Sequence, residues 1–373
     1  MKLAITGYNG FIGSHLVNSL IYKSDINKND ICLIDKKDFE SSIHLKEKLI
    51  DCDSVIHLAG VNRHEDPTFI YNENIRLTKL IIQSISEKTK TIIFSSSIQQ
   101  DLKNPFGEAK LKCCQLFSDW AITNNTNFVN LKIPNIFGAF GKPNYNSFIS
   151  TFCNNLIYNK EININNDNEI NLLYIDDLIE NISSCIAKTN SSNSEISKFN
   201  GIVSSSIAKV FEILKNQWDQ YHLNNTIPNI NSKFEMNLFN TLRSFIPHEL
   251  FYPKKLVKHI DERGFFSEII KTEGQGQFSV STTNPGITRG NHFHTRKIER
   301  FIVAQGKALV ELRKIDTNEK LSFILEGNDL NYIDIPIWYT HNIKNIGKET
   351  LVTMFWINES YNPKNSDTYF IKV

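Results

Sequence analysis

The glycine-rich turn near the start of the chain limits the possible folds more than any other feature. A short apolar segment, Lys2–Thr6, leads into the evenly spaced Gly7, Gly10 and Gly13, and a segment with helical periodicity, Ile12–Tyr22, follows. Glycines between a strand and a helix let the backbone approach a pyrophosphate, which the free N–H groups of the helix N-terminus then bind. The turn therefore predicts an α/β domain that binds a dinucleotide.

The next part of the chain alternates between short apolar runs and segments of helical periodicity. The strand-like runs are Ile31–Asp35, Ser54–Ala59, Thr91–Ser95 and Phe128–Ile133, and the helical segments are Glu73–Glu87 and Lys110–Ala121. Right-handed β-α-β connections then give a doubly wound parallel sheet of the Rossmann type. We expect residues 186–206, rich in Ser and Asn, to form a surface loop, whereas Asn224–Ile246 has no clear pattern.

The pattern changes after Phe251, where short strand-like segments alternate with turn residues. The segments are Gln277–Ser281, Arg300–Ala304, Lys307–Arg313, Leu321–Leu325 and Leu351–Ile357. Short strands at regular spacing are typical of a small β-sandwich or barrel. The sequence therefore predicts two domains, an α/β domain over residues 1–245 and an all-β domain over residues 250–373.

Composition limits the partners of the chain. Among 373 residues, 41 Lys and Arg nearly balance 40 Asp and Glu, so a basic surface for nucleic acid is not expected. No apolar run reaches the ~18 residues of a membrane helix, and the first residues lack the apolar core of a signal peptide. The six cysteines lack zinc-ribbon spacing, so we expect reduced thiols. These features predict a cytoplasmic protein.

The end of the second predicted strand bears on the choice of dinucleotide. Asp35 lies where a carboxylate would accept hydrogen bonds from the adenosine ribose of NAD. Lys36 and Lys37 follow at once and would suit the 2′-phosphate of NADP. The residues themselves leave NADPH and NADH open.

Several motifs along the first part, taken together with the glycine turn, resemble the extended short-chain dehydrogenase/reductase family. They are His57-Leu58-Ala59-Gly60, Asn74, Ser95-Ser96-Ser97, Pro134-Asn135-Ile136-Phe137-Gly138 and Tyr174-Ile175-Asp176-Asp177. The resemblance implies a nicotinamide cofactor and a substrate contact at Asn135. The predicted cofactor-binding residues are Gly7, Asn9, Gly10, Phe11, Ile12, Gly13, Asp35, Lys36, Ala59, Gly60 and Lys110.

One position departs from that family at the reaction centre. The family signature is Tyr-x-x-x-Lys, but Phe106 takes the place of the tyrosine and Lys110 that of the lysine. The resemblance makes Ser97, Phe106 and Lys110 the catalytic positions. Phenylalanine has no proton to donate, and general acid catalysis contributes ~10²–10⁴-fold. We therefore expect a weak reductase unless Ser97 or water donates the proton.

A second set of candidate residues lies in the all-β part. His292 and His294 alternate along a predicted strand, so both rings point to one face, and Glu299 and His341 can join them from neighbouring strands. Three imidazoles and a carboxylate suit Zn, Fe, Mn or Ni, with Zn expected here. The spacing resembles the two cupin motifs and departs from them at Trp338, where the family usually has glycine. The other matching positions are Gly306, Pro336 and Asn345.

Two further stretches, Asp261–Glu268 and Arg289–His292, resemble motifs of the deoxysugar 3,5-epimerases, which are cupins acting on nucleotide-linked 4-keto sugars. That resemblance implies substrate contacts at Arg263, Glu268 and Arg289, with the planar guanidinium of Arg263 on a diphosphate. The base that moves a proton stays open. The candidates are a cupin histidine such as His292, Tyr339, Lys297 and Glu268.

The order of the two parts resembles, over the whole chain, the bifunctional capsular-polysaccharide enzymes of the CapF type. This resemblance implies C3 epimerisation of a UDP-4-keto-2-acetamido-2,6-dideoxyhexose in the cupin. NADPH-dependent reduction of the 4-keto group in the first domain follows, toward UDP-N-acetyl-L-fucosamine precursors, in a homodimer. Two alternatives stay open. One is an epimerase whose first domain binds nucleotide but reduces poorly, and the other is a non-catalytic sugar-nucleotide sensor or scaffold.

Overall fold

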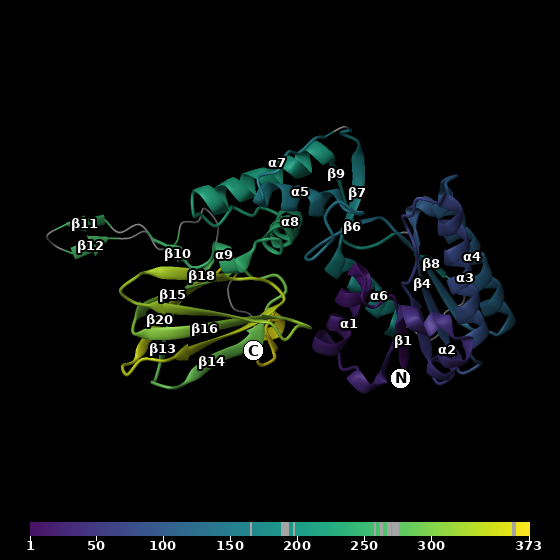
Figure 1. Ribbon diagram of the computed structural model, residues 1–373, viewed down its shortest axis with the longest axis horizontal. Helices are drawn as coiled ribbons and strands as arrows, with labels where there is room; N and C mark the ends of the chain where they lie inside the picture. Colours follow the sequence, from purple (N-terminus) through teal and green to yellow (C-terminus); the bar gives the residue numbers. More distant parts are fainter. Residues whose placement is uncertain are drawn as a thin grey trace. The chain divides into compact units, whose positions relative to one another are not determined.

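The computed structural model describes most of the chain as two compact units (Figure 1). The described residues are 1–164, 166–187, 194–196, 198–256, 259–261, 264–266, 270, 276–359 and 363–373. One unit comprises residues 1–137 and 169–205, and the other comprises 138–168 and 206–373. Each unit thus takes two segments of the sequence. The predicted limits, 1–245 and 250–373, divide the chain only once and stay a prediction.

The first unit is built on a six-stranded parallel sheet in the order β2-β1-β3-β4-β5-β8. Its strands are β1 (Leu3–Thr6), β2 (Ile31–Ile34), β3 (Ser54–His57), β4 (Thr91–Ser97), β5 (Asn127–Ile133) and β8 (Ser194–Ile196). The order reverses direction between β1 and β3. At such a switch point, the carboxyl ends of the strands leave a crevice where open α/β sheets bind ligands. The predicted doubly wound sheet is confirmed.

Helices flank this sheet as the β-α-β pattern requires. They are α1 (Phe11–Lys23), α2 (Ser42–Leu49), α3 (Pro67–Ser84), α4 (Pro105–Thr123) and α6 (Ile175–Ala187). Leu45 of α2, Leu77 of α3 and Phe117 of α4 belong to one buried apolar cluster with Val55 and Ile92 of the sheet. The two remaining helices, α1 and α6, pack against each other. Each of these helices buries its apolar face, and this burial provides most of the stability of helices in folded proteins.

The predicted loop at 186–206 is wrong in part. Among its described residues, Ser194–Ile196 form β8, which pairs in parallel with β5, and Val203–Ser206 form β9. Polar residues are tolerated there because an edge strand pairs through its backbone and needs only one neighbour. A smaller sheet joins β9 to β7 (Glu169–Tyr174) and β6 (Asn135–Phe137).

The second unit holds an all-β barrel of two five-stranded antiparallel sheets, ordered β10-β18-β15-β20-β13 and β17-β16-β19-β14-β21. Along β16, Ala308, Val310 and Leu312 are fully buried at every second position, as one face of a strand requires. The predicted cupin barrel is confirmed as a fold class. Its strands are β10 (Lys254–Lys255), β13 (Gln277–Thr283), β14 (Thr288–Phe293), β15 (Glu299–Gln305), β16 (Lys307–Lys314), β17 (Lys320–Glu326), β18 (Asn331–Ile335), β19 (Tyr339–Asn345), β20 (Leu351–Ile357) and β21 (Tyr369–Phe370), with β11 (His259–Asp261) paired separately to β12 (Gly264–Phe266).

Helices also belong to the second unit. They are α5 (Phe148–Ile157), α7 (Ile207–Trp218), the π-helical turn η4 (Asp219–Leu223), α8 (Lys233–Arg243) and α9 (His248–Phe251). The patternless segment Asn224–Ile246 therefore contains α8. Within the described residues, no helix is both long and apolar enough to cross a membrane.

A buried polar network ties these helices to the barrel. Arg300 of β15 donates two hydrogen bonds, of 2.7 and 2.9 Å, to Asp334 of β18, and both side chains are about 1% exposed. Tyr221 of η4 contacts the same carboxylate, and its hydroxyl lies 2.5 Å from that of Tyr252. Removing one partner of a buried ion pair costs roughly 3–5 kcal/mol, so this network attaches η4 firmly to β15 and β18.

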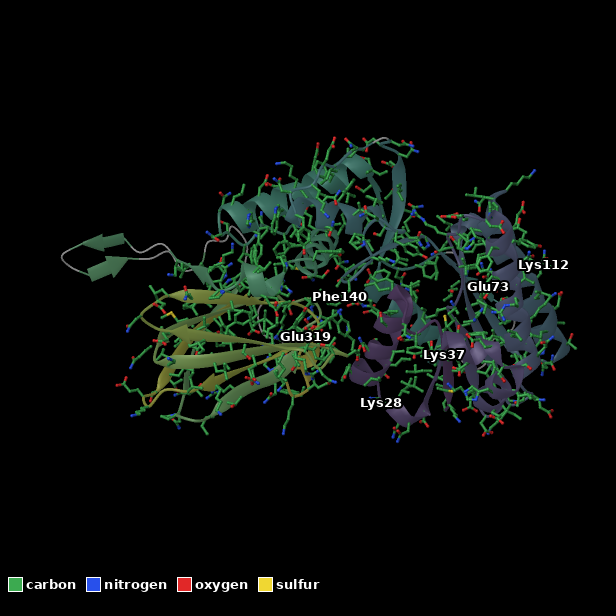
Figure 2. All side chains as sticks on the ribbon, viewed as in Figure 1. Lys28, Lys37, Glu73, Lys112, Phe140 and Glu319 are labelled. Atoms are coloured by element: carbon green, nitrogen blue, oxygen red, sulfur yellow. The ribbon has the colours of Figure 1, made fainter. Side chains whose placement is uncertain are left out.

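The surface of both units carries charges of both signs, as the balanced composition predicts. Figure 2 shows, for example, Lys28 and Lys112 in the first unit and Glu319 in the second, and all three are exposed.

Candidate functional site

The glycine turn connects β1 to α1 with the geometry of a phosphate cradle. Gly7 has a φ of +67°, which L side chains rarely adopt, and its carbonyl accepts the N–H of Gly10 at 2.9 Å. A Cβ on Gly13 would overlap the Gly7 carbonyl oxygen, so only glycine lets the helix start this close to the strand. Gly10 caps α1 without a side-chain hydrogen bond. The N-terminal N–H groups therefore fit the predicted pyrophosphate.

The loop after β3 is fastened beside this turn by Thr6, a residue that the sequence analysis did not single out. The Thr6 hydroxyl accepts the N–H groups of Leu58 and Ala59 at 3.1 and 3.0 Å, and it donates to Nδ1 of His57 at 2.8 Å. Burial, helped by the charge of Lys110, lowers the pKa of His57 to about 3, so the ring is neutral. The two N–H groups occupy the acceptor sites of the Thr6 hydroxyl, which leaves its own proton for a hydrogen bond to Nδ1. Ala59 thus stands next to the glycine turn.

Asp35 occupies the end of β2, as predicted, but part of its bonding capacity is used locally. Its carboxylate accepts the N–H of Lys36 at 2.6 Å, and its own N–H donates to Asp38 at 2.6 Å, which forms a capping box on the next 3-10 turn. Lys36 and Lys37 are exposed. A carboxylate and two ammonium groups therefore lie together where the adenosine ribose is expected, and the choice between NAD and NADP stays open.

The structure brings Lys110 and Phe106 together on α4. The Lys110 Nζ lies 5.6 Å from the Phe106 ring centroid and donates to the Ser95 carbonyl at 2.6 Å. A Cβ on Gly60 would lie 3.6 Å from this Nζ, so Lys110 reaches the loop beside the glycine turn. Burial lowers its pKa to about 8. Ser97 ends β4, where its Oγ accepts the N–H of Gln99 at 3.2 Å.

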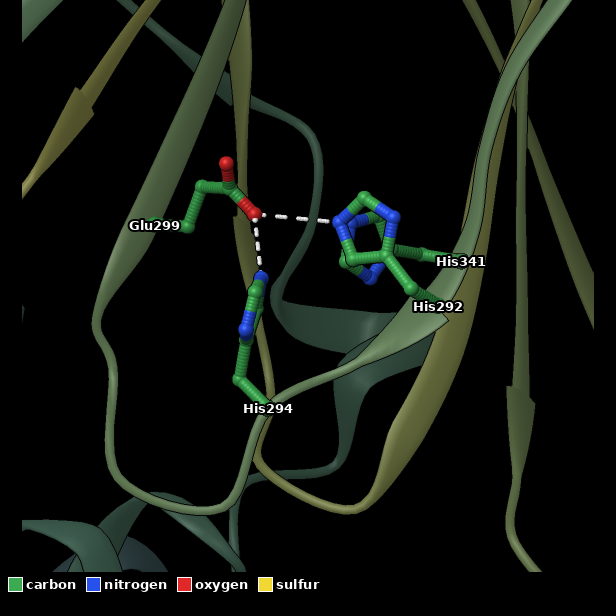
Figure 3. Close-up of side chains that lie close together, drawn as sticks. All are labelled: His292, His294, Glu299 and His341. Atoms are coloured by element: carbon green, nitrogen blue, oxygen red, sulfur yellow. Dashed lines mark hydrogen bonds and ion pairs between the residues drawn. The ribbon is translucent and has the colours of Figure 1, made fainter. Parts of the chain in front are cut away.

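The predicted metal ligands converge inside the barrel (Figure 3). His292 is the last residue but one of β14, His294 directly follows that strand, Glu299 begins β15 and His341 lies on β19. One ligand atom from each lies within 4.8 Å of all the others. Figure 3 shows Glu299 between two of the histidines, with its Oε2 3.1 Å from Nε2 of His294 and 3.4 Å from Nε2 of His341.

The electrostatics of this cluster fit a cation. Burial would raise the pKa of Glu299, but its contacts with His294 and His341 outweigh burial and hold that pKa well below its usual value. Burial, together with the neighbouring His341 and His294, lowers the pKa of His292 to about 3, which leaves a neutral imidazole. A carboxylate and a neutral imidazole are forms that bind a divalent metal. Burial would lower the pKa of His294, but its contacts with Glu299 and Asp367 outweigh burial and raise that pKa, so a metal bound there would displace a proton.

His341 provides the clearest test of fit. It is fully buried, Nδ1 has no hydrogen-bond partner among the described residues, and Nε2 has only the 3.4 Å contact with Glu299, which lacks hydrogen-bond geometry. A buried polar group without a partner costs stability, and a divalent ion at the cluster would satisfy one of these nitrogens. The four residues therefore suit a zinc-type ion.

The predicted substrate-binding residues have different outcomes. Arg263 and Glu268 lie outside the described residues. Arg289 is exposed on β14, where it pairs with Ile343, and a bulge separates it from His292. Asn135 is exposed at the start of β6 in the other unit.

The two other described candidates for the epimerising base lie close to the metal ligands in the sequence. Lys297 is 4% exposed between His294 and Glu299. Tyr339 begins β19, the strand of His341, and burial raises its pKa.

Comparisons with known proteins agree with both halves of this structure. The chain matches the NAD dependent epimerase/dehydratase family over residues 3–198 and the polysaccharide biosynthesis C-terminal domain over residues 259–369. The UDP-2-acetamido-2,6-beta-L-arabino-hexul-4-ose reductase of Pseudomonas aeruginosa is 32% identical and aligns with 100% of this chain and 99% of its own length. The spore coat polysaccharide biosynthesis protein SpsL of Bacillus subtilis is 29% identical over 31% of this chain and 82% of its own.

A solved structure matches the full length as well. The capsular polysaccharide assembling protein CapF of Staphylococcus aureus is 33% identical, with a TM-score of 0.62 and 100% of each chain covered. Fold and matches together define an enzyme of the epimerase or reductase class with a polysaccharide-biosynthesis domain after its dinucleotide domain. The chain belongs to the NAD dependent epimerase/dehydratase family and is similar to CapF over its full length. A nicotinamide cofactor goes with that family.

Proposed function

We propose that the chain converts a UDP-4-keto-2-acetamido-2,6-dideoxyhexose in two steps, C3 epimerisation in the barrel and NADPH-dependent 4-keto reduction in the dinucleotide domain. The observation that carries the proposal is the convergence of His292, His294, Glu299 and His341 in a chain that also contains a dinucleotide crevice. The relative from Pseudomonas aeruginosa, similar over its full length, is named as a reductase of a UDP-linked hexul-4-ose. Its name supports the substrate class, and the direction toward UDP-N-acetyl-L-fucosamine precursors is part of the proposal.

The epimerisation requires removal of the proton on C3, next to the ketone, and its return to the other face. Zinc held by the four ligands would act as a Lewis acid on the substrate oxygen and stabilise the enolate. If His292 is a ligand, its lone pair is engaged, so the proton must go to another group. Lys297 and Tyr339 are the described candidates, and Glu268 lies outside the described residues.

The reduction requires a hydride, which the nicotinamide cofactor supplies, and a proton for the ketone oxygen. The glycine turn would hold the pyrophosphate, and Lys110 would hold the nicotinamide ribose, as in the family. Phe106 donates no proton, so the Ser97 hydroxyl, a water molecule or the Lys110 ammonium group must do so. Phe106 is also the observation that favours a second candidate function, an epimerase whose first domain binds nucleotide but reduces poorly.

The test supplies the zinc-loaded full chain with the UDP-4-keto sugar in D₂O, with and without NADPH. The two-step proposal predicts deuterium at C3 in both samples and NADPH oxidation in the second. Exchange without oxidation supports the epimerase alone. If neither deuterium exchange nor NADPH oxidation occurs, the result supports a sugar-nucleotide sensor or scaffold. The homodimer and the cytoplasmic location remain predictions, and the homodimer can be tested by analytical ultracentrifugation.

A further inference from the structure

We propose that Asp367, near the C-terminus, is a positioning residue for the metal centre, and this inference rests on the proposed zinc site. Its backbone carbonyl fixes the ring and the tautomer of His294. Its carboxylate holds the loop that connects His294 to Glu299. Through this one residue, the last segment of the chain sets the geometry of two of the four ligands.

The first contact is between the Asp367 carbonyl and the His294 ring. The carbonyl oxygen lies 2.5 Å from Nδ1 of His294, and His294 is 4% exposed. A carbonyl can only accept a hydrogen bond, so Nδ1 must carry the proton. The opposite nitrogen, Nε2, donates to the Glu299 carboxylate at 3.1 Å, and a metal bound at Nε2 would take the place of that proton. Metal-binding histidines usually donate their other ring N–H to a carbonyl or carboxylate in this way.

The second contact is between the Asp367 carboxylate and the loop after His294. It accepts the N–H of Thr295 at 3.1 Å, the Thr295 hydroxyl at 2.7 Å, the N–H of Arg296 at 3.0 Å and the N–H of Lys297 at 3.1 Å. Asp367 is 4% exposed, so these neutral donors replace its hydration shell. Three successive backbone N–H groups around one carboxylate fix the path of the loop into β15. Glu299 is the first residue of that strand, so the Asp367 carboxylate also influences the position of Glu299.

The rest of the C-terminal segment holds Asp367 in place. Strand β21 follows directly and pairs with β14, with Phe370 opposite His292. The Ile371 N–H donates to the Asn291 carbonyl at 2.9 Å, and Arg313 donates to the Lys372 carbonyl at 2.6 Å. The segment is therefore attached at several points. Asn365 also accepts a hydrogen bond from the Arg296 side chain at 3.1 Å, but among the described residues Asp367 is the one that contacts both the His294 ring and the backbone N–H groups of the loop.

The test measures zinc affinity of the full chain by competition with a chromogenic chelator. Asp367→Ala keeps the backbone carbonyl but removes the carboxylate that holds it against the loop, so the carbonyl is no longer fixed on His294. Zinc binding should weaken by about 10–100-fold, the usual effect of disturbing an outer-shell partner. Thr295→Val, which removes one donor, should weaken zinc binding several-fold, whereas Thr295→Ser keeps the hydroxyl and should match the unmodified chain. Arg313→Met is the control, since it loosens the same segment away from His294 and should leave affinity unchanged.

Two readouts separate positioning from general destabilisation. The absorption of bound Co²⁺ should change in Asp367→Ala because His294 is no longer aligned. In the zinc-loaded variant, ¹⁵N NMR should show that Nδ1 is no longer the only protonated nitrogen of the His294 ring. Unmodified zinc affinity in a folded Asp367→Ala protein overturns the inference. If that variant does not fold, equal affinity in Thr295→Val and Thr295→Ser overturns it. Absence of zinc binding in the unmodified chain refutes the metal centre itself and this inference with it.

Discussion

The two sites of this molecule differ in how complete they are. In the barrel, all four predicted ligands converge, and His294 even has its outer hydrogen-bond partner. In the dinucleotide crevice, the glycine turn and Lys110 have the expected geometry, but the tyrosine that supplies a proton is replaced by Phe106. In the dinucleotide domain, the residues expected to bind the cofactor are thus present although the residue expected to donate the proton is missing. Each prediction below tests whether the barrel site is complete or whether the dinucleotide domain lacks only its proton donor.

The largest expected effect comes from restoring the missing hydroxyl. Phe106→Tyr adds one oxygen at the edge of a ring whose centroid lies 5.6 Å from the Lys110 Nζ, so the ammonium charge can lower the pKa of the new hydroxyl. We expect NADPH oxidation with the UDP-4-keto sugar to rise on the order of 10²–10⁴-fold, measured by absorbance. Phe69→Tyr, at a ring that is 42% exposed, is the matched control. Equal rates for the unmodified chain and Phe106→Tyr would mean that another group already donates the proton, and the contrast would disappear.

The next effect is on the complete site. His294→Ala removes a ligand and should weaken zinc binding by more than ~100-fold, beyond the loss expected for an outer-shell partner. Elemental analysis of the purified protein measures the bound zinc, and C3 exchange in D₂O should be lost with it. His64→Ala, at an exposed histidine of the other unit, should change neither. Full zinc occupancy in His294→Ala would remove this residue from the ligand set.

A third prediction concerns the glycine turn, which should bind cofactor despite Phe106. A Cβ on Gly10 would lie 3.1 Å from the Gly7 carbonyl oxygen, and Gly10→Val adds two methyl groups where the pyrophosphate must approach. Overpacking costs about 1–3 kcal/mol, so cofactor binding should weaken by roughly 10–100-fold in calorimetry. Zinc binding should not change. If the unmodified chain binds neither NADPH nor NADH, the first domain is a relic.

The smallest effect is the titration of Lys110. Burial lowers its pKa from 10.5 to about 8, so the unfolded chain binds more protons than the folded chain between these values. The contribution of this residue to the free energy of unfolding therefore rises with pH across that window. Lysine ¹³C NMR of the cofactor-free protein should show one side chain titrating near pH 8, absent in Lys110→Met. A midpoint above 10 would mean that Lys110 is not buried as described.

Local sequence pattern predicted the features that depend on nearby residues. The glycine spacing, the β-α-β alternation and the His292/His294 pair all lie within short segments, where backbone periodicity decides which side chains share a face. The strand β8 was missed because its sequence is polar. Helix α8 was missed although Phe234, Leu238 and Leu242 recur every four residues, because asparagines surround this short repeat. Both depend on pairing or packing with distant parts of the chain.

The same limit applies to the supporting residues. Asp367 lies 73 positions from His294, and Thr6 lies 51 positions from His57, so no local spacing links either pair. Only their geometry shows what they do. A threonine directly before the first glycine, and an aspartate just before the last strand, were visible in the sequence but had no assigned partner.

One measurement tests the two-step account most directly. The full chain, loaded with zinc, is given the UDP-4-keto sugar in D₂O together with NADPH deuterated at the transferable position, and the product is analysed by NMR. The account predicts one deuterium at C3, from the solvent, and one at C4, from the cofactor, in the same product molecule. Deuterium at C3 alone, with the ketone intact, would contradict the second step and leave an epimerase attached to a domain that only binds nucleotide.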